Sequence, residues 1–288
     1  MDANMLRRVL FAVIAIPLLV AVVWLGGWPL AAVVAVATML GTTELFDLAA
    51  VQGIRPFRET GRVVAAAVPL GLGAALAGAS AHNFVERWWV FAALGVAIWV
   101  LGLAVATRGP GDRPLAAAAV TLLTMIYATM LPSTLFFIRH ATWSTRSWAG
   151  TAVVFFPLVV TWMCDTAAML GGRAIGGPKL SPVVSPGKTR SGAIAGVIGG
   201  VAIGALYAAV VFTRTGVAIG IIPAALLALV LTVVGQIGDL AESLLKREAG
   251  VKDSSALIPG HGGVLDRLDS LYFVLPVAAA GYRFLGIF

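Results

Sequence analysis

Acidic side chains at the ends of apolar segments are the first feature of this sequence that could do chemistry. Asp239 lies near the end of one long apolar segment, and Asp266 and Asp269 stand three residues apart at the start of the next. That spacing puts two helical side chains on neighbouring parts of one surface, so both carboxylates can face one point. Hard oxygen ligands of this kind suit Mg²⁺, which takes one or two protein carboxylates and completes its shell with water and phosphate.

Basic residues and glycines surround these carboxylates. The candidates for contacts with phosphate groups are Lys188, Lys246, Arg247, Lys252 and Arg267. Gly262 and Gly263 let backbone amides approach an anion closely. His261 either orders this loop through a hydrogen bond or transfers a proton. A metal ion together with a polyphosphate is therefore the ligand combination that the segment predicts.

Other polar residues within apolar segments divide into two kinds. Asp165 stands near the end of an apolar segment, where a carboxylate is costly unless it pairs, binds a cation or faces water. It is a functional candidate or the partner of a neighbouring arginine. Glu44 and Asp47 are expected to form a solvated helix end. Glycines at four-residue spacing predict close helix packing and not chemistry: Gly192, Gly196, Gly200 and Gly204.

The elements that must position these residues are membrane helices. Hydrophobic residues make up 60% of the 288 residues and charged residues only 11%, whereas a soluble domain carries roughly 25% charged residues. These values, with a mean hydropathy of +0.97, exclude a soluble globular enzyme. A spanning helix needs about 20 mostly apolar residues. We predict an all-α polytopic integral membrane protein with about nine transmembrane helices, at 9–25, 29–50, 63–81, 88–107, 115–138, 149–171, 191–213, 217–245 and 268–286.

The basic residues predict the orientation of these helices. When the loops are assigned alternately to the two sides, most of the 20 Lys and Arg residues fall on one side. The positive-inside rule then gives a cytoplasmic N-terminus and an external C-terminus. We expect residues 1–148 to form about five helices for scaffolding and lipid access, and 149–288 to form the catalytic region. The cytoplasmic loops 172–190 and 246–267 belong to that second region.

The spacing of polar residues between 243 and 269 resembles the signature of the phosphatidate cytidylyltransferase family, also called CDP-diacylglycerol synthases. The residues that carry this resemblance are Ser243, Lys246, Arg247, Lys252, Asp253, Ser255, Pro259, His261, Gly262, Gly263, Asp266, Arg267 and Asp269. The Asp165 segment and the run Ser185-Pro186-Gly187-Lys188-Thr189 are also similar to that family. Residues 1–148 are similar to it only in hydropathy.

The resemblance implies an enzyme of phospholipid biosynthesis that joins CTP and phosphatidic acid to give CDP-diacylglycerol and pyrophosphate. It implies that Asp239 and Asp266 bind metal, with Asp269 as a third carboxylate, and that Lys252 and Arg267 join them in catalysis. The residues expected to bind substrate are Ser185, Lys188, Thr189, Lys246, Arg247, His261, Gly262, Gly263 and Asp165. Two cations are expected, one being Mg²⁺ and the second Mg²⁺ or a monovalent ion. A homodimer is implied as well.

The expected partners are CTP, phosphatidic acid and membrane lipids, and no nucleic acid. Short loops and frequent Ala, Val and Gly are typical of a bacterial plasma membrane protein, with the active site on its cytoplasmic face. Two other functions stay open: an ion-coupled membrane transporter, and a related enzyme that uses another lipid phosphate or nucleotide. The carboxylates gather at one face of the membrane and not at its midplane, which argues against the transporter. A preference for CTP over UTP or ATP would distinguish the cytidylyltransferase from the related enzymes.

Overall fold

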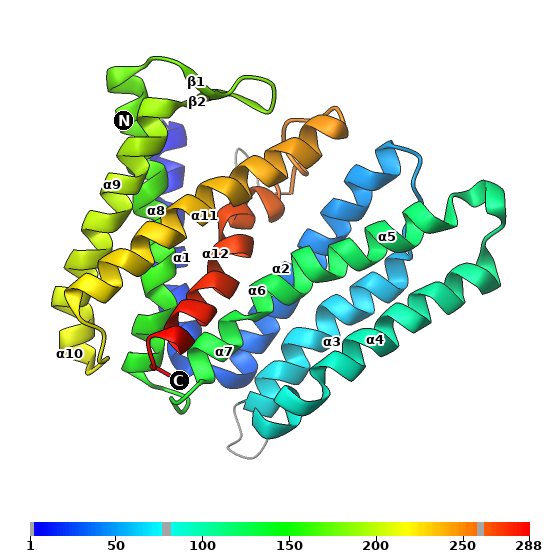
Figure 1. Ribbon diagram of the computed structural model, residues 1–288, viewed down its shortest axis with the longest axis horizontal. Coiled ribbons are helices and arrows are strands. Elements are labelled where there is room, and N and C mark those ends of the chain that lie inside the picture. The colour runs from blue at the N-terminus through cyan, green and yellow to red at the C-terminus, as the bar shows by residue number, and fades with distance from the viewer. Residues whose placement is uncertain (1–2, 77–81, 258–261) are drawn as a thin grey trace.

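The computed structural model describes residues 3–76, 82–257 and 262–288, and nearly all of this chain is helical (Figure 1). The helices are α1 (Ala3–Leu25), α2 (Gly27–Val51), α3 (Arg58–Leu76), α4 (His82–Thr107), α5 (Pro114–Thr124), α6 (Leu131–Ser133), α7 (Leu135–His140), α8 (Trp148–Ile175), α9 (Arg190–Tyr207), α10 (Thr213–Thr215), α11 (Ile221–Glu248) and α12 (Leu265–Phe284). A short 3₁₀ helix at Pro110–Asp112 precedes α5. Two π-helical turns, Met125–Met130 and Ala208–Phe212, continue α5 and α9.

The expectation of an all-α membrane protein is confirmed. Helices overlap every predicted segment, and within the described chain six are long and apolar enough to cross a membrane. Those six are Gly27–Val51, Trp88–Thr107, Pro114–His140, Trp148–Ile175, Arg190–Thr215 and Ile221–Glu248. The count of nine spans, the sides on which the termini lie and the division after residue 148 stay predictions.

A small β-hairpin interrupts the helices in the segment that was expected to be a loop. Strand β1 (Lys179–Ser181) pairs antiparallel with β2 (Ser185–Thr189), with Lys179 opposite Thr189 and Ser181 opposite Ser185. The hairpin leads directly into α9, because the Thr189 side chain accepts a hydrogen bond from Gly192 N at 3.1 Å and so caps the helix. The end of the hairpin is therefore fixed to the start of α9.

The glycines at four-residue spacing pack helices together, as predicted. Gly192, Gly196, Gly200 and Gly204 are all buried in α9. A Cβ at Gly200 would lie 2.1 Å from Thr232 Cγ2 of α11, and one at Gly196 would lie 3.0 Å from the Cys164 carbonyl of α8. Only residues without a side chain permit this approach, so α8, α9 and α11 form one tightly packed group.

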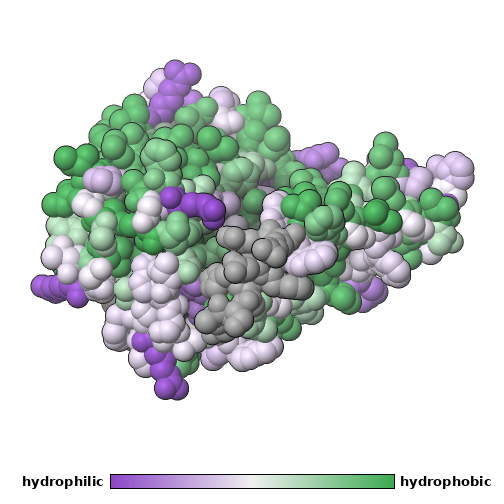
Figure 2. Space-filling model, turned by 60° about the horizontal axis from the view of Figure 1, so that its bottom comes forward, coloured by the Kyte–Doolittle hydropathy of each residue, from purple (hydrophilic) through white to green (hydrophobic). Residues whose placement is uncertain are grey.

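Two groups of helices lie side by side with α12 between them (Figure 1). One group contains α8, α9 and α11, and the other contains α2, α3, α4 and α5. The hairpin and the loop after α11 lie at the same end of the molecule, while α12 ends at the opposite end. Phe136, Phe156 and Phe212 are fully buried in the main apolar core. Figure 2 shows that apolar side chains also cover broad parts of one outer face, with hydrophilic groups at its margins and a few within it.

Candidate functional site

An ion pair joins the hairpin to α11. The Lys188 ammonium of β2 contacts Asp239 Oδ2, and both side chains are about a quarter to a third exposed, at 30% and 26%. Ser243 Oγ, one turn further along α11, lies 3.4 Å from Asp239 Oδ1 and donates to it. The structure therefore brings together two residues that the sequence proposed for the site, one from the hairpin and one from α11, although they lie far apart along the chain.

Asp269 joins this group because α11 and α12 cross closely. A Cβ at Gly238 would lie 2.9 Å from the Asp269 carbonyl and 3.0 Å from Phe273 Cδ2, so the crossing requires glycine. Asp269 interacts electrostatically with Asp239 and Lys188, and Asp165 of α8 interacts with all three. Three carboxylates and one lysine thus share one electrostatic environment, and the functional role of Asp165 stays a prediction.

A second lysine connects α11 to the start of α12. Lys246 Nζ lies 2.5 Å from Asp266 Oδ1 and 3.0 Å from Glu242 Oε1, one turn back along α11. Glu242 is completely buried, and Lys246 is only 8% exposed. Because a buried carboxylate needs a partner to offset its lost hydration, Lys246 is committed to these two acids.

Asp266 organises the loop that precedes α12. Its Oδ2 accepts hydrogen bonds from Ser254 N, Ser254 Oγ and Gly263 N, each at 2.8 Å. Partial burial alone would raise the pKa of the Asp266 carboxyl. The hydrogen bonds from Lys246, Gly263 and Ser254 favour the charged form more strongly, so the pKa lies below its ordinary value. Both oxygens of Asp266 are therefore already engaged with the protein.

The remaining predicted residues connect two segments, belong to the hairpin or lie exposed at the surface. Arg247 links the hairpin to the loop after α11. Its Nε donates to the carbonyl of Val184, between β1 and β2, and its Nη1 donates to the carbonyl of Val251 in that loop. Thr189 caps α9, and Ser185 lies half-buried in β2. Lys252 and Arg267 are exposed at the surface.

Gly262 and Gly263 lie in the loop just before α12. Gly262 has a positive φ of 76°, and a Cβ there would lie 2.5 Å from Asp266 Oδ2. Gly263 donates its N–H to the same carboxylate. The Gly263 backbone therefore donates to a carboxylate of the protein itself, whereas a phosphate group of the substrate was the expected acceptor. His261 lies outside the described residues.

The prediction for Glu44 was wrong, and the prediction for Asp47 was right. Asp47 is a solvated residue that forms a 2.6 Å ion pair with Arg58. Glu44 is buried, 4% exposed, and accepts hydrogen bonds from the loop before α12. The sequence carried one signal for this, since a carboxylate about two turns inside an apolar helix needs a partner. It gave no sign that the partner lay more than 200 residues away.

Metal binding rests on the chemistry of the oxygen donors. Across residues 3–76, 82–257 and 262–288, no group of three or more His, Cys, Asp or Glu side chains converges as a ready metal site. Mg²⁺ commonly takes only one or two carboxylates, with water and substrate phosphates as its other ligands. The neighbouring carboxylates of Asp239 and Asp269 fit that requirement.

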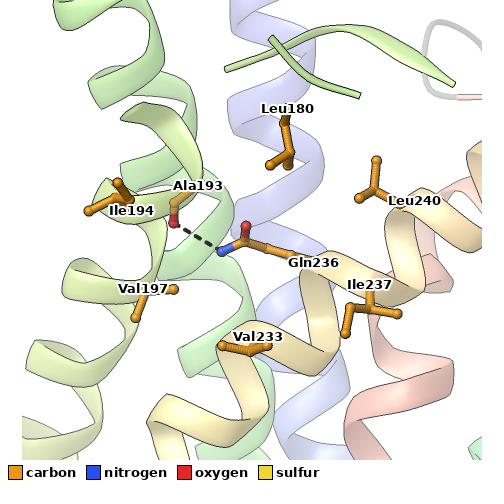
Figure 3. A pocket seen from close by; sticks show the side chains of 8 residues that line it. All are labelled: Leu180, Ala193, Ile194, Val197, Val233, Gln236, Ile237 and Leu240. Atoms are coloured by element: carbon orange, nitrogen blue, oxygen red, sulfur yellow. Dashed lines mark hydrogen bonds between the residues drawn. The ribbon is translucent and has the colours of Figure 1, made fainter. Parts of the chain in front are cut away.

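An apolar pocket of about 260 Å³ lies between the hairpin, α9 and α11. Its lining comes from β1, α9 and α11: Leu180, Ala193, Ile194, Val197, Val233, Gln236, Ile237 and Leu240. Figure 3 shows Gln236 reaching from α11 toward α9, where its Nε2 donates to the Ala193 carbonyl at 3.1 Å. The pocket thus has an apolar wall on each helix, and Leu240 directly follows Asp239 in the sequence.

This combination of helices and charges defines a class of protein: a polytopic membrane protein with clustered carboxylates and lysines at one end of its bundle. The model of the cytidylyltransferase family matches residues 6–285. The phosphatidate cytidylyltransferase of Synechocystis sp. is 31% identical over 94% of each chain. This chain belongs to the cytidylyltransferase family, as the resemblance predicted.

Other relatives match mainly over about half of their length. The phosphatidate cytidylyltransferase of Brucella suis is 50% identical over 139 residues, which is 48% of each chain. That of Staphylococcus saprophyticus is 41% identical over 135 residues, 47% of this chain and 50% of the relative. In these matches the chain spans about half the length of the curated relatives.

Proposed function

We propose that this protein is a phosphatidate cytidylyltransferase, which joins CTP and phosphatidic acid to give CDP-diacylglycerol and pyrophosphate. The observation that carries the proposal is the group formed by Lys188, Asp239 and Asp269 where the hairpin, α11 and α12 meet. Membership of the cytidylyltransferase family and the names of the bacterial relatives support it. The proposal includes a bacterial plasma membrane location with the site on the cytoplasmic face.

The proposed reaction needs alignment and charge neutralisation more than a strong base. A phosphatidate phosphate is already an anionic nucleophile near neutral pH. Its oxygen attacks the α-phosphorus of CTP, and the bond between the α-phosphorus and the bridging oxygen breaks to release pyrophosphate. Because two polyanions repel each other, positive groups must offset that repulsion at close range.

The lysines and arginines near the hairpin suit this role. Lys188 and Arg247 hold the hairpin next to α11 and place two positive charges there. Lys252 and Arg267, exposed on the loop and on α12, are proposed to receive the phosphates of CTP. Asp239 and Asp269 would hold Mg²⁺, which when bound polarises the α-phosphate and stabilises the leaving pyrophosphate. Asp266 as a direct metal ligand and the identity of the second cation stay predictions.

The apolar pocket supports the lipid half of the proposal. Ile194, Val197 and Val233 provide an apolar wall for a chain, and the same lining includes Gln236 and Leu240, which flank Asp239 along α11. An acyl chain of phosphatidic acid in this pocket would leave its headgroup near Lys188. The proposed homodimer is a separate prediction and does not enter this argument.

Transfer of label from α-³²P-CTP into solvent-extractable lipid tests the proposal. Purified protein in mixed micelles should transfer label only when both phosphatidic acid and Mg²⁺ are present, and CTP should be preferred over UTP and ATP. Label transfer from UTP or ATP with another lipid phosphate would favour the related enzyme. A folded protein that labels no lipid would overturn the proposal and favour the transporter.

A further inference from the structure

A single carboxylate connects α2 to the loop and helix that carry the site. Glu44 Oε1 accepts hydrogen bonds from Ser255 Oγ at 2.8 Å and Val264 N at 3.0 Å. Its Oε2 accepts from Ser254 Oγ and Leu265 N, both at 2.9 Å. These contacts span 210 to 221 residues of sequence. Glu44 thus joins the N-terminal half of the chain to the loop before α12.

Glu44 also caps α12 from another helix. The first N–H groups of a helix have no partner within it, and Val264 at the N-cap provides no side-chain hydrogen bond. Glu44 satisfies the N–H groups of Val264 and Leu265 and places a negative charge at the positive end of the helix. Four donors offset the cost of burying this charge.

The contacts of Glu44 continue directly into the proposed site. Ser254 Oγ lies 2.9 Å from Glu44 Oε2 and 2.8 Å from Asp266 Oδ2, and its one proton serves one carboxylate at a time. A Cβ at Gly263 would lie 2.4 Å from Glu44 Oε2, so the loop closes tightly over this carboxylate. Asp266 then holds Lys246, and Asp269 follows within the same turn of α12.

We propose that Glu44 is a positioning residue for the reaction. It fixes the first turn of α12 and the Ser254–Ser255 segment, and so sets where Asp266 and Asp269 lie relative to α11. Its four hydrogen bonds are all with the protein, so its proposed effect on the reaction is exerted through the groups that it holds. The activity measurements below rest on the proposed cytidylyltransferase function, whereas the amide measurement does not.

The test replaces Glu44 by glutamine, which keeps its size but loses its charge and turns one oxygen into a donor facing other donors. Asp47→Asn, one turn later on α2, is the matched control because it makes the same kind of change at a solvated carboxylate. We expect Glu44→Gln to lower kcat about 10- to 100-fold, because a shift of about 1 Å in site groups costs that much. The KM for CTP should change less. Glu44→Asp should restore part of kcat, and Asp47→Asn should match the wild type.

Hydrogen exchange at the start of α12 gives the second readout. In Glu44→Gln the peptide containing the Val264 and Leu265 amides should exchange at least tenfold faster, while peptides from α8 and α9 stay unchanged. Ser255→Ala removes one donor to Glu44 and should cause a smaller change of the same kind, which keeps the test available if Glu44→Gln folds poorly. A lower Tm with normal kcat per folded molecule would reduce Glu44 to a structural role and overturn the proposal.

Two further outcomes would also overturn it. One is unchanged exchange of the Val264 and Leu265 amides in Glu44→Gln, and the other is an equal loss of kcat in Asp47→Asn. If the wild type itself labels no lipid, the proposed function fails, but faster exchange in Glu44→Gln still supports the positioning of α12. The two proposals therefore fail in distinguishable ways.

Discussion

Lys188 and Asp239 neutralise each other across the junction between the β-hairpin and α11. Both were proposed as site residues, one for phosphate and one for metal. While the pair is intact, the lysine charge is not fully available to a phosphate, and the carboxylate is not fully available to a cation. Binding of CTP with Mg²⁺ is therefore expected to exchange this ion pair for two separate contacts, one for each ligand.

Replacing Lys188 should weaken the binding of the phosphate substrate without weakening the binding of Mg²⁺. In Lys188→Gln we expect the KM for CTP or phosphatidic acid to rise about 10- to 100-fold, since hydrogen bonds to charged groups contribute about 1.5–3 kcal/mol. The Mg²⁺ concentration for half-maximal activity should stay the same or fall, because Asp239 loses its competing partner. Steady-state titrations of each ligand measure both effects.

Lys179→Gln is the matched control, since Lys179 is an exposed lysine on the other strand of the same hairpin. It should leave both titrations unchanged. A raised Mg²⁺ requirement in Lys188→Gln would show that the lysine supports the metal site and does not compete with it.

Asp239→Asn and Asp266→Asn should both reduce turnover but differ in stability. Asp239 is partly exposed and bonded to Lys188 and Ser243, so its replacement should lower kcat about 100-fold or more with little change in Tm. Asp266 accepts from Lys246, Ser254 and Gly263, so its replacement should lower both kcat and Tm. Lipid-labelling assays and thermal unfolding in detergent separate the two cases. Equal Tm values for the two variants would contradict the structural role of Asp266.

The pKa of Asp266 predicts how its contribution to stability depends on pH. The pKa of the Asp266 carboxyl is lower in the folded protein than in the unfolded chain, so folding favours the ionised carboxylate. The stabilisation is complete above the unfolded pKa of about 3.9 and is lost as the pH falls through the folded value. The Tm difference between the wild type and Asp266→Asn should therefore be full at neutral pH and shrink in acid below the unfolded pKa. A difference that grew on acidification would contradict this assignment.

Much of the fold and part of the site could be predicted from local patterns. Apolar runs set the helices, and the spacing of Gly192 and Gly200 correctly indicated close packing, because both signals depend only on neighbours along one helix. The joining of Lys188 to Asp239 could not be predicted from spacing, because it depends on how the hairpin folds over α11. The hairpin itself was missed because its short strands are half polar and follow no apolar alternation.

Glu44 and Glu242 show the limit of sequence reasoning more sharply. Each is an acid near the end of an apolar helix, and solvation is the ordinary expectation there. In the structure both are buried, Glu44 against the N-terminus of α12 and Glu242 against Lys246. The i,i+4 spacing of Glu242 and Lys246 on α11 is a local signal for their ion pair. The burial of Glu44 depends on how α12 packs against α2, which spacing within one helix does not reveal.

The apolar pocket between α9 and α11 predicts a dependence on acyl-chain length. Ile194 and Ile198 are both isoleucines on α9 with 63% and 64% of their surface exposed, but only Ile194 lines the pocket. Ile194→Trp should fill the pocket and raise the KM for dioleoyl phosphatidic acid about tenfold, because about 1.4 kcal/mol of binding free energy corresponds to that factor. Dihexanoyl phosphatidic acid, whose chains bury less apolar surface, should be affected much less. Ile198→Trp adds the same bulk to the same helix outside the pocket and should leave both KM values unchanged. If Ile194→Trp raised both KM values equally, or if Ile198→Trp had the same effect, the acyl chain would have to bind elsewhere.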